Sequence, residues 1–428
     1  MKIKTLFQSL RENELINTSL LTGIGTVIAQ VSGVVIMKIV ALTFGASGVA
    51  LISQFVDFVT LSTSVASGGI QQGVVKYTAQ YKQDDSLLLK VLSSSLRVTI
   101  ISATVIGIII YYFAVEISSK LFQTNEYTYI IQIFAFNCIF FALNTLLVRI
   151  LNGIGNIKKL VIINITSSLL TLVLVVLLLR HSGFPGALMA LSVTQSIVFL
   201  IALRYTISLK LYNKVALFKR IDMQVTLKLL AFTAMGICTL VLGPLVNIGI
   251  RNYLAENISI GDAGIWSGMI KLSNSYLSIV TITLSYYYLP KLSSISGHEM
   301  IRLEIFQGQK TVLPLLAMAL LLLYRYRLEL IFLVYSEEFA RMERFFLPQL
   351  LGDFIKIASF FLSYLLIAKA KAKMYILLSV VFAIITYFLT IFMAERYGAI
   401  GAVYAHPVIY SVYLVTLVYS LREYVFAR

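Results

Sequence analysis

Long apolar runs, each about the length needed to cross a bilayer, recur along the whole chain of 428 residues. A helix needs about 20 residues to span the hydrocarbon core of a membrane. Runs of that length predict six spans in the first half, over 17–43, 49–74, 87–114, 127–151, 160–179 and 185–206. Six more follow over 224–250, 264–289, 309–333, 345–367, 374–394 and 399–421. The pattern predicts an all-α polytopic membrane protein with twelve transmembrane helices.

Two short segments of the first half recur in the second half at nearly the same offset. Gly45–Val49 matches Gly261–Ile265 (261 minus 45, or 216), and Gly183–Ala187 matches Gly398–Ala402 (398 minus 183, or 215). Gly and Ala are frequent in membrane helices, so the shared offset is what distinguishes these two matches from chance. Duplicated membrane units are typical of secondary transporters. We expect two six-helix lobes, 1–208 and 224–428, related by a pseudo-two-fold axis along the membrane normal and joined by a cytoplasmic linker at 209–223.

The composition agrees with a membrane protein. Hydrophobic residues make up 59% of the chain, charged residues 13%, and the mean hydropathy is +0.89. Soluble chains carry roughly 25% charged residues. The net charge of +16 would suggest a nucleic-acid partner in a soluble protein, but here the basic residues lie in short loops. Alternate loops and termini hold 22 Lys and Arg against 8 on the opposite side, which predicts that both termini are cytoplasmic and that no nucleic acid is bound.

The sequence lacks the patterns that indicate disulfides, metal sites, nucleotide binding or a catalytic domain. Cys138 and Cys238 both lie in apolar runs, so neither a disulfide framework nor a metal site is indicated. The three histidines, His181, His298 and His406, lack the close spacing of metal ligands. The chain has no phosphate-binding G-x-x-x-x-G-K-[ST] motif, and its outer loops are too short for a catalytic domain. We therefore expect a transporter, not an enzyme, without a metal or other cofactor.

Charged residues inside the predicted spans are the main candidates for function. They are five cations, Lys38, Arg97, Arg149, Lys271 and Lys356, and two acids, Asp57 and Asp353. An ionised side chain at the bilayer centre costs about 2.5 to 3.5 kcal/mol or more, so each one needs water, a partner or a substrate. Five cations minus two acids leave +3, which favours an anionic cargo, phosphate above all.

The spacing of these residues suggests roles for some of them. Asp57 and Lys271 occupy nearly equivalent places in the two halves, and we place both toward a cleft between the lobes. Asp353 and Lys356 share one helix face, so both mutual neutralisation and substrate contact fit them. Lys38 is shallow enough for its ammonium to reach the membrane interface.

Two arginines are further candidates for binding, and three helix-breaking residues are candidates for hinges. Arg149, beside a Gly and Asn cluster, is a candidate for an anionic head group, and Arg251 for the substrate or a lipid phosphate. Gly33 in the first span and Gly243 and Pro244 in its counterpart are candidate hinges for alternating access. Gly and Pro are also frequent in membrane helices without any such role.

Five short segments resemble a known family. They are FGASG at Phe44–Gly48, VKYTAQY at Val75–Tyr81, GIW at Gly264–Trp266, YLP at Tyr288–Pro290, and Gln349–Tyr375 with its GDFIK and IAKAKAKMY motifs. In their order and spacing the chain resembles the Wzx-type flippases of the multidrug/oligosaccharidyl-lipid/polysaccharide exporter superfamily. On the matching segments, the resemblance adds Lys76 and Lys369 to Asp353 and Lys356 as candidate substrate-binding residues.

The resemblance implies a MATE-like fold with a cationic central cavity that opens alternately to the two sides of the bacterial inner membrane. It implies an undecaprenyl-pyrophosphate-linked oligosaccharide as cargo, moved from the cytoplasmic to the periplasmic leaflet. Membrane lipids, and the polymerase and chain-length regulator of the same pathway, are the candidate partners.

Three other functions fit the sequence less well than a flippase. Cation-coupled drug exporters of the same superfamily use an acid in the first helix, where this chain carries Lys38 and no acid. A major facilitator transporter would carry a glycine-acid-basic loop signature, which is missing from 76–90. A glycan polymerase would use the same lipid but needs a substantial outer loop. The charged residues of Leu333–Arg344 are interpreted instead as a solvated surface cluster.

Overall fold

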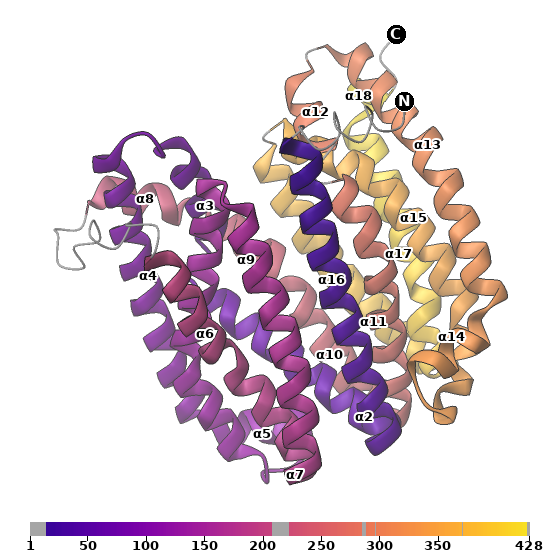
Figure 1. The fold of residues 1–428 in the computed structure, drawn as a ribbon. Coiled ribbons are helices and arrows are strands. Elements are labelled where there is room, and N and C mark those ends of the chain that lie inside the picture. The colour runs from indigo at the N-terminus through magenta and orange to yellow at the C-terminus, as the bar shows by residue number, and fades with distance from the viewer. Residues whose placement is uncertain (1–13, 208–221, 285–287, 296, 370, 426–428) are drawn as a thin grey trace, which may run out of the picture. The chain divides into compact units, whose positions relative to one another are not determined.

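The computed structural model describes residues 14–207, 222–284, 288–295, 297–369 and 371–425, and within these ranges every regular element is a helix (Figure 1). The predicted all-α class is confirmed. Most of the predicted linker at 209–223 and both chain ends lie outside the described residues.

Contacts divide the chain into two compact units, which are described separately. Unit 1 comprises Met1–Ile36 and Phe55–Pro244, and unit 2 comprises Met37–Gln54 and Leu245–Arg428. The units interleave, because the middle of the first long helix belongs by its contacts to unit 2. These units have different boundaries from the expected lobes 1–208 and 224–428, and the lobes stay a prediction.

Unit 1 contains most of α2 (Glu14–Ala66) and the helices α3 (Gln71–Gln80), α4 (Asp85–Tyr112), α5 (Ala114–Phe122), α6 (Thr128–Ile154), α7 (Ile157–Ile207), α8 (Met223–Leu230) and α9 (Thr233–Leu240). Unit 2 contains the middle of α2, nearly all of α10 (Leu242–Asn257), and α11 (Ile260–Thr283), α12 (Leu289–Ser294), α13 (His298–Arg325) and α14 (Arg327–Val334). A 3-10 helix η3 (Glu337–Met342) and the helices α15 (Glu343–Ala368), α16 (Ala372–Tyr397), α17 (Ala399–Ser420) and α18 (Arg422–Val425) complete it.

Among the described residues, nine helices are long and apolar enough to cross a membrane. Two of them, α2 and α7, each run through two predicted spans, because the helix resumes directly after one glycine with positive φ, Gly45 (φ 64) or Gly183 (φ 63). The protein is an integral membrane protein. The total of twelve spans stays a prediction, because the number of membrane-length helices differs from the number of spans.

Polar caps fix several helix starts. The side chain of Asp84 accepts hydrogen bonds from two backbone N–H groups at the start of α4, and Asp222 does the same for α8. Ser259 accepts from the N–H of Asp262 at the start of α11. Such caps satisfy N–H groups that have no partner within the helix.

The second internal match is also a match in structure. Gly183 and Gly398 have nearly the same backbone angles (φ 63, ψ −146 and φ 70, ψ −158). Three residues later, a Cβ atom on Gly186 or Gly401 would lie 2.0 Å from the carbonyl oxygen of Leu178 or Met393 respectively. The chain therefore makes the same tight turn once in each unit, and only glycine fits it.

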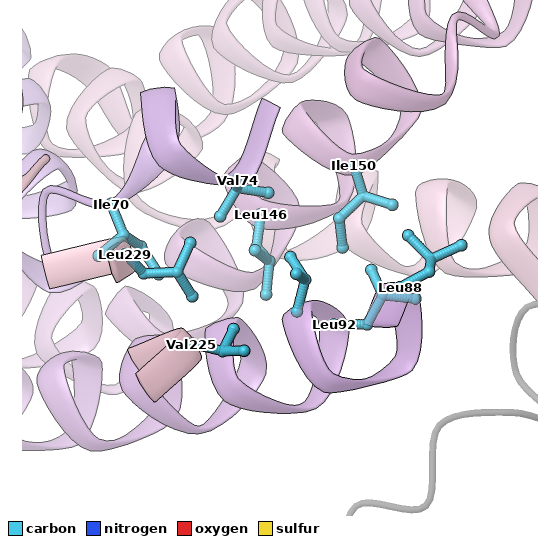
Figure 2. Packing of buried hydrophobic residues seen from close by; sticks show 9 residues of the cluster. Ile70, Val74, Leu88, Leu92, Leu146, Ile150, Val225 and Leu229 are labelled. Atoms are coloured by element: carbon cyan, nitrogen blue, oxygen red, sulfur yellow. The ribbon is translucent and has the colours of Figure 1, made fainter. Parts of the chain in front are cut away.

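Helices α3, α4, α6 and α8 of unit 1 meet in a buried apolar cluster (Figure 2). Its members are Ile70, Val74, Leu88, Val91, Leu92, Leu146, Ile150, Val225 and Leu229. Val225 and Leu229 are four residues apart and so lie on one face of α8. Burial of that face fixes α8 against α3 and α4 within unit 1.

Unit 2 also carries exposed apolar side chains. On α13 of unit 2, Leu315, Met318 and Leu322 are exposed and share a helix face. A soluble protein rarely exposes so continuous an apolar face. Contact with lipid accounts for it.

Candidate functional site

The carboxylate of Asp353 is the centre of a buried polar cluster in unit 2. Asp353 has no solvent-exposed surface. Its Oδ2 atom accepts hydrogen bonds from the hydroxyls of Ser273, at 2.7 Å, and Tyr276. Its Oδ1 atom accepts from Gln349 at 3.2 Å and lies 2.9 Å from Nε2 of His406. Four donors from α11, α15 and α17 thus stabilise the charged form of this acid.

Helix periodicity explains how these groups come together. Ser273 and Tyr276 are three residues apart on α11, and Gln349 and Asp353 are four apart on α15, so each pair faces one way. Close approach of α15 to α17 requires Gly352, where a Cβ atom would lie 2.2 Å from the His406 ring.

Lys356 lies one helical turn beyond Asp353. Its Nζ atom is 5.5 Å from the ring centre of Tyr410, which is itself one turn beyond His406 on α17. Asp353 attracts the Lys356 ammonium but has its closest contacts with other groups, so both neutralisation and substrate contact stay open for Lys356. Lys271 is half-buried on α11, two residues before Ser273.

Lys38 and Lys369 both bind backbone carbonyls of unit 2. Nζ of Lys38 donates to the carbonyl oxygen of Phe332 at 2.6 Å and to that of Tyr335, at the C-terminal end of α14. These carbonyls have no helical partner and carry partial negative charge. Nζ of Lys369 donates to the carbonyl oxygen of Ile295 at 2.6 Å.

Arg251 is 4% exposed and makes its contacts inside unit 2. Its Nε atom donates to the Ser267 hydroxyl and its Nη1 atom to the Gln54 side chain, each at 2.7 Å. Its guanidinium also lies 5.8 Å from the Trp266 ring centre. These contacts join α10, α11 and the middle of α2.

The remaining candidates lie in unit 1. Lys76 is exposed on α3, with its Nζ atom 5.3 Å from the ring centres of both Tyr77 and Phe232. Arg149 is half-buried on α6, and within the described part of the chain its Nε atom has no hydrogen-bond partner. Asp57 is half-buried near the end of α2.

An ion pair in unit 1 joins α4 to the start of α8. Nζ of Lys90 is 3.0 Å from the carboxylate of Asp222. Its hydrogen bond to Asp222, together with the N–H groups of the helix start, lowers the pKa of this acid below its usual value.

The predicted hinges differ in their surroundings. Gly33 lies inside α2, where the residue with non-helical angles is Gly45. Gly243 and Pro244 lie in the first turn of α10, directly after the interruption at Val241 between α9 and α10. Their role as hinges stays a prediction.

Sequence reasoning missed the partners of Asp353. His406 was considered only as a metal ligand, and the described residues contain no group of His, Cys, Asp and Glu that could hold a metal. The signal available was its place inside an apolar run, where an ionisable side chain needs a partner. The charged residues Glu337, Glu338 and Arg341 of η3 are exposed, as expected of a solvated cluster. In addition, Glu338 accepts a hydrogen bond from the backbone N–H of Ala46, and Arg341 lies 3.7 Å from Asp262.

Comparison with known proteins gives a consistent result. Residues 15–296 match a family described as polysaccharide biosynthesis protein. Proteins named lipid III flippase from Escherichia coli (strain K12) and Shigella flexneri are each 29% identical over 399 residues, which cover 93% of this chain and 96% of theirs.

Solved structures agree on the fold. An inward-facing multidrug resistance MATE family transporter of the MOP superfamily matches with a TM-score of 0.78 and 10% identity, covering 94% of this chain and 95% of that one. The lipid II flippase MurJ, in an inward closed conformation, matches with a TM-score of 0.74 and 15% identity over 95% of this chain and 87% of its own. The expected MATE-like fold is confirmed.

Proposed function

This chain belongs to the polysaccharide biosynthesis protein family, and from that premise we propose that it is a lipid-linked oligosaccharide flippase. Its cargo is an undecaprenyl-pyrophosphate-linked oligosaccharide, moved by alternating access from the cytoplasmic to the periplasmic leaflet of the bacterial inner membrane. The name and the near-complete coverage of the two lipid III flippases support this cargo. Cytoplasmic termini, and contact with the polymerase and chain-length regulator of the pathway, belong to the same proposal.

The surroundings of Lys356 carry the proposal. Because four other donors occupy the Asp353 carboxylate, the Lys356 ammonium rests against an aromatic ring instead of closing a short ion pair. A cation held in this way inside an apolar helix can exchange its contact with Tyr410 for a phosphate oxygen. A neutral or cationic cargo would gain nothing from it.

The other candidates are assigned two kinds of role. Lys76, Arg149 and Lys271 are proposed, with Lys356, as contacts for the pyrophosphate along its path. Lys38, Arg251 and Lys369 donate to protein oxygens, so we assign them to holding the helices that carry the path. Asp57 is proposed to orient cations in unit 1.

Reconstitution tests the proposal. The purified protein is placed in liposomes with a fluorescent undecaprenyl-pyrophosphate-linked oligosaccharide, and its appearance in the opposite leaflet is followed by quenching. We expect wild-type protein to move it, and Lys271→Gln and Lys356→Gln to move it more slowly. Lys120→Gln, at an exposed lysine of α5, is the matched control.

Two outcomes would reject the flippase function. One is wild-type transfer no faster than in protein-free liposomes. The other is efflux of a cationic dye without lipid transfer, which would favour a drug exporter.

A further inference from the structure

We propose that a proton on His406 switches Lys356 between a neutralised state and a state that binds the anionic head group of the substrate. The inference rests on the proposed function and adds the control of its central cation. When His406 is neutral, the charge of Asp353 balances Lys356. When His406 is protonated, its positive charge balances the carboxylate across the hydrogen bond that already joins them, so the charge of Lys356 is left to attract an anion.

His406 lies closer to the Asp353 carboxylate than Lys356 does. Nε2 of His406 lies 2.9 Å from Oδ1 of Asp353, within hydrogen-bond reach, whereas the Lys356 ammonium lies over the ring of Tyr410. A neutral imidazole donates its Nε2 proton to the carboxylate, so the added proton goes to Nδ1. The His406 side chain is 15% exposed, so protein atoms do not enclose the ring completely.

Charge counting shows the size of the switch. Asp353 contributes −1, Lys356 +1 and neutral His406 nothing, which gives zero; protonation of His406 makes the sum +1. Inside a membrane protein, where charges are weakly screened, one unit of charge within a few ångströms of a phosphate alters its binding strongly. Release of the proton returns the cluster to zero and lets the anion leave.

The neighbouring groups leave His406 as the member that changes charge. Asp353 accepts from four donors, which keep it ionised. From α11 the cluster is faced by Ser273 and Tyr276, from α15 by Gln349, Asp353 and Lys356, and on α17 itself by Tyr410. The charged groups that act on His406 are Asp353 and Lys356.

A metal ion fits this cluster poorly. Every close partner of the carboxylate presents a hydrogen atom to it, whereas a cation needs oxygen lone pairs directed at one point. Protons are therefore the ion that the donor set accommodates.

Binding of geranyl pyrophosphate to the full-length protein in detergent tests the inference. Calorimetry measures the dissociation constant at pH 8.0 and pH 5.5. Acidification removes negative charge from the ligand, which alone would weaken binding. We expect the wild-type protein nevertheless to bind about tenfold more tightly at pH 5.5.

Four variants locate the effect. His406→Gln keeps an amide donor for Asp353 but cannot be protonated, so binding should no longer tighten at pH 5.5. Asp353→Asn should bind tightly at both pH values, and Lys356→Gln weakly at both. His298→Gln, the same exchange at an exposed histidine of α13, should retain the wild-type response.

Tightening that persists in His406→Gln would overturn the switch, and so would an Asp353→Asn protein that binds more weakly than wild type at both pH values. If Asp353→Asn fails to fold, the comparison of His406→Gln with His298→Gln decides. Binding is measured without transport, so a protein that shows the pH response but moves no lipid-linked oligosaccharide would contradict the proposed function and leave the switch standing.

Discussion

The backbone N–H of Ala46 donates a hydrogen bond of 2.9 Å to the Oε2 atom of Glu338. Both residues belong to unit 2, although 292 positions separate them in the chain. Ala46 follows the one residue of α2 with non-helical angles, so Glu338 supplies the cap that the resumed helix lacks locally.

Removal of this cap should destabilise the protein. Glu338→Ala leaves the N–H group at the start of a helix without its acceptor, and we expect a loss of about 0.5–2 kcal/mol of unfolding free energy. Thermal unfolding in detergent measures it. Glu337→Ala, at the exposed neighbouring acid, is the control and should unfold like wild type. Equal midpoints for both variants would show that the cap contributes nothing.

Lys38 should also stabilise the fold. Lys38→Met keeps the length of the side chain but removes the donors for the carbonyl oxygens of Phe332 and Tyr335. Carbonyl groups left without partners away from water cost about 1–3 kcal/mol, so the unfolding midpoint should fall. Lys120→Met should leave it unchanged. An unaltered midpoint together with slower transfer of lipid-linked oligosaccharide would instead assign Lys38 to substrate contact.

The repeated turn predicts equal effects in the two units. Gly186→Ala and Gly401→Ala each bring a methyl group to 2.0 Å from a carbonyl oxygen, an approach that forces the turn apart. Overpacking of this kind costs about 1–3 kcal/mol. Gly23→Ala, where nothing lies within 4 Å, is the matched control. A variant at one glycine that unfolds like wild type while the other does not would show that the two turns are not equivalent.

The helices and one of the two internal matches could be predicted from the sequence, because both depend on local patterns of residues. Apolar runs of membrane length reveal a span wherever it lies, and the glycine turn at Gly183 recurs at Gly398 because the same tight contact requires the same residue. The first match is weaker in structure, since Gly45 has positive φ whereas its counterpart Gly261 lies within α11, behind the cap of Ser259.

Contacts between residues far apart in the chain could not be predicted from local patterns. His406 and Asp353 are separated by 53 positions and Lys38 and Tyr335 by 297, and no spacing rule relates such pairs. Charge alone showed that Lys38, Arg251 and Asp353 need partners, but not which groups satisfy them. Lys38 was a substrate-binding candidate with a side chain able to reach the membrane interface, and the structure shows that its ammonium binds carbonyl groups at the end of α14.

Gly352 should control the position of His406. A methyl group on Gly352 would lie 2.2 Å from Cδ2 and 2.9 Å from Cγ of the imidazole, so Gly352→Ala must displace the ring from Asp353. We expect a loss of about 1–3 kcal/mol of unfolding free energy, together with loss of the tighter geranyl pyrophosphate binding at pH 5.5. The double variant Gly352→Ala/His406→Ala has room for the new methyl group where the ring was. Its unfolding free energy should therefore exceed the value expected from adding the two single losses by about 0.5–3 kcal/mol. Strict additivity, or a Gly352→Ala protein with the wild-type pH response, would mean that the ring has space to remain beside Asp353 and that Gly352 does not position it.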